Sequence, residues 1–259
     1  MNFSLLAVLT ILGMIGGTLC MLEVGRRLGV RRLARDPEGA KAGTGAIDGA
    51  VFGLMGLLIA FTFSGAAARF DARRTMMVEE ANAIGTAWLR LDLLPTAAQP
   101  PLRDKFRQYL DARLAAFRKI PDFAAVKAEL DRATALQSEI WTQAIAACRD
   151  SGSQPATMLL LPALNQMFDV AASRTTGIFM HPPMIIYVML GMLLLAGSLL
   201  AGYGMGVGKI RDWFHALAFV VVMTLAVYVI IDFEFPRVGM IRIHGFEKVL
   251  VDLRQSMNP

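Results

Sequence analysis

The sequence predicts an all-α membrane protein with four transmembrane helices and a soluble helical bundle between the second and third of them. Three observations predict this fold class. Hydrophobic residues make up 55% of the chain, whose mean hydropathy is +0.50. Four apolar runs approach or reach the roughly 20 residues that a helix needs to cross a bilayer. The second run continues into a heptad pattern, and a polar region with helical periodicity follows it. The four runs are residues 3–22, 46–68, 184–203 and 215–231.

The first apolar run, 3–22, has no basic residue before it and no small-residue cleavage site after it. We therefore expect a retained span and not a signal peptide. Gly13, Gly16 and Gly17 are expected to let another helix approach it closely. A loop is predicted at 23–45, and its basic residues are typical of a cytoplasmic loop or of contact with anionic lipid headgroups. These residues are Arg26, Arg27, Arg31, Arg32, Arg35 and Lys41.

One long helix is predicted from Ala46 to Leu94, because no proline interrupts the chain before Pro95. Its first part, 46–68, is apolar or small apart from three polar side chains and is expected to span the bilayer. Beyond it, apolar residues recur in steps of four, three, four and three, which is a heptad seam. The seam residues are Met77, Ala81, Ile84, Trp88 and Leu91. The second span is therefore expected to continue into the bundle and pack against its helices.

Leu57, Phe61 and Ser64 lie at helical spacing on the second span. If several copies of the chain surrounded one axis, Leu57 and Phe61 would form a hydrophobic constriction, and Ser64 would line the same pore. The alternative is that these are ordinary lipid-facing or packed side chains.

The predicted domain organisation has four segments. Residues 1–68 hold the first two spans, 69–183 the soluble bundle, 184–232 the last two spans, and 233–259 a C-terminal segment. Within the bundle, helices are expected to break at Pro95, at Pro121 and at Ser151-Gly152. The C-terminal segment is expected to contain a short strand at 238–243 and an amphipathic helix at 246–255.

Several polar residues of the bundle are candidates for a site. Arg74 would fall on the seam if the heptad began one step before Met77, and it would then need Glu80 or Asp169 as a partner. The alternative is that the seam begins at Met77 and Arg74 is solvated. Asn165 and Asp169, four residues apart, would line a vestibule or bind a cation, or else form hydrogen bonds within the bundle.

Enzyme activity is not expected. The adjacent Glu79 and Glu80 point about 100° apart on a helix, which is poor geometry for an acid–base pair and favours solvated charges. The HExxH, GxSxG, CxxC and GxxxxGK motifs are absent from the sequence, so no cofactor and no metal site is predicted. The formal net charge is +5, and the basic residues gather at the ends of spans, so we expect no nucleic-acid partner.

The second span and its continuation resemble the signature of the bacterial bestrophin-like domain family in the run AFTFSGAAARFDARRTMMVEEANAIGTAWLRLDLLP. LNQMFDVAASR and DFEFPRVGMIRI also resemble family motifs. The family comprises four-span membrane proteins of largely unassigned function, and the resemblance implies a relation to bestrophins, which are homopentameric ion channels lined by the second span. It therefore implies a pentameric homo-oligomer in the bacterial inner membrane, with inorganic ions and membrane lipids as partners. The calcium-binding acidic cluster of animal bestrophins has no clear match here, so calcium gating is not expected.

Four spans place both termini and the bundle on one side of the membrane. The basic short loops favour a bundle outside the cytoplasm, whereas the resemblance implies a bundle inside it, and both orientations stay open. Two functions also stay open: a homo-oligomeric ion channel, and a non-conducting membrane interaction or sensor protein whose bundle binds a partner. A transporter is less favoured, because the spans are unbroken and no clear inverted repeat is present.

Overall fold

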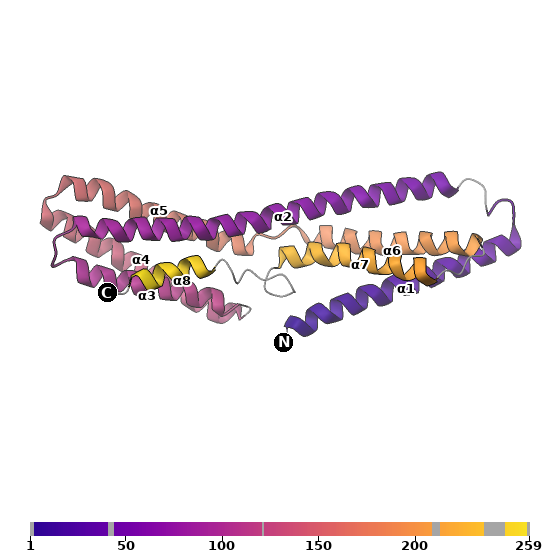
Figure 1. The fold of residues 1–259 in the computed structure, drawn as a ribbon, viewed down its shortest axis with the longest axis horizontal. Helices are drawn as coiled ribbons and strands as arrows, with labels where there is room; N and C mark the ends of the chain where they lie inside the picture. Colours follow the sequence, from indigo (N-terminus) through magenta and orange to yellow (C-terminus); the bar gives the residue numbers. More distant parts are fainter. Residues whose placement is uncertain (1–2, 41–43, 121, 209–212, 236–246, 258–259) are drawn as a thin grey trace. The chain divides into compact units, whose positions relative to one another are not determined.

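The computed structural model describes residues 3–40, 44–120, 122–208, 213–235 and 247–257, and the described residues are helical apart from turns and short connections (Figure 1). The helices are α1 (Phe3–Arg35), α2 (Thr44–Arg90), α3 (Gln99–Arg118), α4 (Phe123–Ser151), α5 (Gln154–Phe179), α6 (Met184–Val207), α7 (Trp213–Glu234) and α8 (Glu247–Ser256), with a 3₁₀ turn at Leu91–Leu93. Four of them, α1, α2, α6 and α7, are long and apolar enough to cross a membrane. The predicted fold class is confirmed. The strand expected at 238–243 lies outside the described residues.

The chain divides into two compact units. Unit 1 consists of Met1–Phe70 and His181–Ile241, and unit 2 consists of Asp71–Met180 and Arg242–Pro259. Helix α2 contributes residues to both units, which agrees with the predicted continuation of the second span into the bundle.

The predicted loop at 23–45 is wrong over its first half, because α1 continues to Arg35. Hydropathy falls after residue 22, but a fall in hydropathy marks a change of surroundings and does not end a helix. Arginine is a good helix former. Glu23 also accepts hydrogen bonds from Arg26 and Arg27, three and four residues further along, and such pairs stabilise a helix.

In unit 1, α1 and α6 pack with their backbones in direct contact. A Cβ atom placed on Gly202 would lie 1.9 Å from the backbone oxygen of Leu22, and one placed on Gly25 would lie 2.0 Å from that of Leu199. Gly29 and Gly206 extend the same contact one turn further on each helix. Only a residue without a side chain fits at such a distance, as in other membrane helix pairs.

A Cβ atom placed on Gly13 or Gly16 would meet nothing within 4 Å in the described chain, so the close approach predicted there is not made within one copy of the protein. Gly17 does face α6, where the side chain of Leu195 lies 3.3 Å from the added atom. The tightest contacts of α1 with α6, at Gly25 and Gly29, lie beyond residue 22, where the sequence predicts a loop.

Unit 2 is a bundle of α3, α4, α5, α8 and the second half of α2 around one apolar core. The predicted seam of α2 is confirmed, because Met77, Ala81, Ile84 and Leu91 are buried and Trp88 is partly buried. The predicted helix ends are also found. The side chain of Asp122 caps α4, and the left-handed Gly152 ends it. Pro162 lies inside α5.

The last helix, α8, packs on α3. Arg254 forms an ion pair with Asp111 at 2.8 Å, and Arg107 donates a hydrogen bond to the carbonyl oxygen of Met257. Leu250 is fully buried in the core of the bundle, as the amphipathic pattern predicts.

Candidate functional site

One face of α2 in unit 1 is exposed along its membrane-spanning part. Leu57 and Phe61 are 52% and 66% exposed, and Ser64 is also exposed. The opposite face of the helix holds it against the rest of the unit. There Met55 packs on Gly197 of α6, and the ring of Phe52 meets that of Phe219 of α7 edge-on. The three residues predicted to line a pore therefore share a face that the described part of the chain leaves uncovered.

The glycines of this span lie on open surface. A Cβ atom placed on Gly49, Gly53 or Gly56 would meet nothing within 4 Å in the described chain. The close helix contact that their spacing predicts is therefore not made within one copy of the protein.

In unit 2, the exposed side of α2 carries polar residues. Glu79, Asn82 and Thr86 line a groove of about 440 Å³ shared with α5, and Arg90 donates a hydrogen bond to the carbonyl oxygen of Leu159 on that helix. Glu79 is exposed, as expected for a solvated helix charge.

Arg74 is 40% exposed and forms an ion pair with Asp71, three residues earlier on the same helix, at 3.1 Å. This agrees with the alternative in which the buried seam begins at Met77.

The prediction that Glu80 is a solvated charge is wrong, because its side chain is 0% exposed. One carboxylate oxygen accepts a hydrogen bond from Nε of Arg113 at 2.6 Å, and the other is paired with Arg174. Glu80 lies three residues after Met77 and four before Ile84, which places it on the seam side of α2. That spacing was the signal in the sequence. A carboxylate at such a position is retained only with cations beside it.

The cluster of Glu80, Arg113 and Arg174 joins α2, α3 and α5 inside the bundle and holds one more positive than negative charge. Carbonyl, hydroxyl and aromatic groups stabilise the excess positive charge. Arg113 also donates to Oγ1 of Thr175 at 3.0 Å, and the guanidinium of Arg174 lies 3.5 Å from the centre of the Phe117 ring. Burial by itself would lower the pKa of Arg113, but the Glu80 carboxylate outweighs it, so the pKa is raised above its ordinary value.

Asn165 and Asp169 both lie exposed on α5. They are turned away from the bundle core, on a surface that water or another chain would reach. Their role in a vestibule or in cation binding stays a prediction.

A second ion cluster, in unit 1, was missed by sequence reasoning. Glu234 at the end of α7 is 1% exposed and accepts a hydrogen bond from Nε of Arg69 of α2 at 2.8 Å. Nδ1 of His181 lies 3.2 Å from the other oxygen of the same carboxylate. The three residues lie far apart in the sequence, so no local pattern connects them. A cavity of about 250 Å³ lies beside the cluster and is also lined by Phe61.

Among the described residues, no group of three or more His, Cys, Asp or Glu side chains could hold a metal ion. Four spanning helices, one of them continuing into a helical bundle, define a multi-pass helical membrane protein. The sequence matches the family model of the Bestrophin-like domain over residues 12–244, and the chain therefore belongs to the bestrophin-like family.

The fold is also similar to solved structures of a bacterial bestrophin homolog from Klebsiella pneumoniae. One, with a tyrosine-to-alanine mutation, has a TM-score of 0.67 at 14% sequence identity, and the match covers 95% of this chain and 97% of the other. Another, with a tryptophan-to-alanine mutation, has a TM-score of 0.65 at 14% identity and coverages of 95% and 96%. No curated protein matches the sequence.

Proposed function

We propose that the protein is a homo-oligomeric ion channel, a pentamer in the bacterial inner membrane, with a pore lined by the exposed face of α2. The observation that carries this proposal is the uncovered face formed by Leu57, Phe61 and Ser64 on a spanning helix. Membership of the bestrophin-like family supports it, because bestrophins are homopentameric channels with the second span around the pore.

The chemistry of this face suits a gate. A ring of Phe61 and Leu57 side chains from several copies would narrow the pore and exclude water, which raises the barrier to ions. The hydroxyl of Ser64, about one turn further along α2, would coordinate an ion that has passed the ring of Phe61 and Leu57 side chains. The open glycines Gly49 and Gly53 would allow the α2 helices of neighbouring copies to approach closely.

The polar residues of unit 2 would form the vestibule of this channel. Glu79 and Asn82 on α2 and Asp169 on α5 are exposed, and acidic side chains around an ion path attract cations. Arg74 and Asn165 are also exposed to some degree and would contribute to the same surface.

Replacing Phe61 by alanine is expected to raise single-channel conductance or open probability several-fold, because the widest apolar side chain leaves the constriction. Native mass spectrometry of the detergent-solubilised protein should first give the mass of a pentamer. Planar-bilayer recording on the same chromatographic peak then measures the current.

The matched control is Phe214→Ala on α7. Phe214 is an equally apolar and exposed side chain, 76% exposed, but it lies on another helix. Currents of this variant should equal those of the unaltered protein. A monomer or dimer without current would contradict the channel and would favour a bundle that binds a partner protein.

A further inference from the structure

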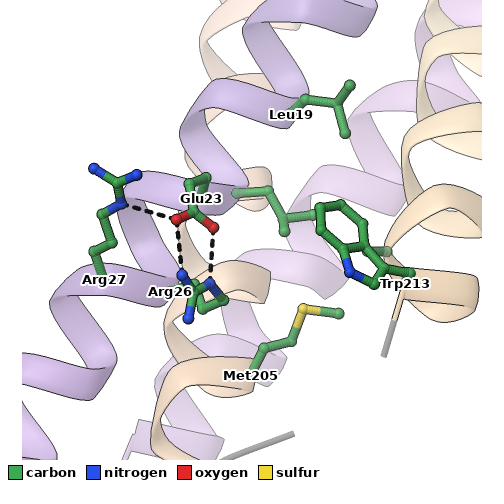
Figure 2. A pocket seen from close by; sticks show the side chains of 8 residues that line it. Leu19, Glu23, Arg26, Arg27, Met205 and Trp213 are labelled. Atoms are coloured by element: carbon green, nitrogen blue, oxygen red, sulfur yellow. Dashed lines mark hydrogen bonds and ion pairs between the residues drawn. The ribbon is translucent and has the colours of Figure 1, made fainter. Parts of the chain in front are cut away.

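Unit 1 contains a cavity of about 370 Å³ among α1, α6 and α7 that neither the proposed pore nor the buried ion clusters use. Figure 2 shows side chains of two kinds around it. The apolar wall is formed by Leu19, Met205 and Trp213. The charged end is formed by Glu23, Arg26 and Arg27.

The charged end is held in place by its own hydrogen bonds. Glu23 accepts two bonds from Arg26, from Nε and Nη2, each at 2.7 Å, and one from Nε of Arg27 at 2.8 Å. Arg27 is bound to Glu23 through Nε, and no hydrogen bond to Glu23 is drawn from either of its terminal amino groups (Figure 2). Its side chain is 67% exposed. Two cations and one anion leave an excess positive charge, and Glu23 does not use the terminal amino groups of the exposed Arg27, an arrangement that suits a phosphate group.

The cavity lies at the end of the apolar part of α1, next to a row of exposed arginines. Arg27, Arg31 and Arg35 are exposed at four-residue spacing and form a basic ridge that begins at the cavity. Trp213 begins α7, and tryptophan is enriched where a span meets the membrane surface. An apolar wall therefore ends at a cationic ridge at the level of the headgroups. A ligand that fits both parts has an apolar body and an anionic head.

We propose that this cavity binds one anionic phospholipid. Its phosphate would accept hydrogen bonds from Arg27 and Arg26, and one acyl chain would lie along Leu19, Met205 and Trp213. A zwitterionic lipid fits less well, because its ammonium group would add positive charge beside the two guanidinium groups. The site is separate from the proposed pore, since it lies on α1, α6 and α7 and not on the exposed face of α2.

Native mass spectrometry of the delipidated full-length protein tests the proposal. The protein is titrated with phosphatidylglycerol or phosphatidylcholine of identical acyl chains, and bound lipid is counted per subunit. We expect one tight phosphatidylglycerol per subunit. Arg27→Gln should weaken it about tenfold, the usual effect of losing a charged hydrogen bond. Arg35→Gln removes the same charge from the same ridge outside the cavity, and should change binding less than about twofold.

A second variant addresses the apolar wall. Leu19→Trp adds bulk to the wall without changing charge and should weaken phosphatidylglycerol as strongly as Arg27→Gln. If Arg27→Gln is not monodisperse, the lipid binding of Leu19→Trp tests the proposal in its place. Three results would overturn the proposal: equal binding of the two lipids, an equal loss in Arg35→Gln, or displacement of the lipid by millimolar inorganic phosphate. Displacement by inorganic phosphate would show that the site binds a free anion and not a lipid. The readout is bound lipid mass, so a protein without current would still give a clear answer.

Discussion

Replacing Glu80 by glutamine is expected to destabilise the protein by about 3–5 kcal/mol, the usual cost of removing one member of a buried ion cluster. The glutamine would leave Arg113 and Arg174 as two buried cations without an anion between them. Both are almost fully buried, so neither can turn to water without opening the bundle. Thermal unfolding of the detergent-solubilised protein, followed by tryptophan fluorescence, measures the effect.

Glu79→Gln is the matched control, because it is the neighbouring residue with the same charge and is exposed. Its midpoint should equal that of the unaltered protein. Equal midpoints for the two variants would contradict the buried cluster. A triple variant, Glu80→Leu with Arg113→Met and Arg174→Met, replaces the whole ion cluster by apolar side chains. It should recover most of the lost stability, since apolar residues of similar volume often replace buried ion pairs without cost.

Replacing Gly202 by alanine is expected to destabilise unit 1 by about 3 kcal/mol, at the upper end of what overpacking costs. The added methyl group would lie 1.9 Å from the backbone oxygen of Leu22. Backbone atoms cannot move aside as a flexible side chain can, so α1 and α6 would have to separate. The separation would loosen the contact of Gly25 and Gly206 as well. Thermal unfolding and the monodisperse fraction on gel filtration both report the change.

Gly191→Ala is the control for this variant. Gly191 lies on α6 as well, and a Cβ atom placed on it would meet nothing within 4 Å. Alanine is the better helix former by roughly 1 kcal/mol, so this variant should be as stable as the unaltered protein or slightly more stable. A Gly202→Ala protein of unchanged stability would show that the two backbones are not in contact.

The elements of this fold that repeat regularly could be predicted from the sequence. The four spans follow from apolar length, and the seam of α2 follows from its heptad spacing, with Ile84 and Leu91 fully buried as expected. The helix end at Ser151-Gly152 could be placed because termination by a left-handed glycine depends on a few adjacent residues.

The parts that could not be predicted depend on residues far apart in the chain. The pair of Arg69 and Glu234 bridges 165 residues, and the partners of Glu80 lie 33 and 94 residues away. The glycine contact of α1 and α6 lies at residues where a loop was predicted, because hydropathy marks the lipid-facing part of a helix and not the residue at which the helix ends. Helical spacing places Leu57 and Phe61 on one face of α2, and their role in lining a pore stays a prediction.

The docking of α8 on α3 sets an order of events during synthesis. Leu250 and Met257 complete the apolar core of the bundle, yet they are translated only after the two spans α6 and α7. Helices α2 to α5 therefore leave the ribosome with part of their core open, and they stay so while the last two spans enter the membrane. Exposed apolar surface of this kind favours aggregation and the binding of chaperones. A ribosome-bound chain that stops before residue 247 should therefore be more sensitive to protease in unit 2 than the released protein.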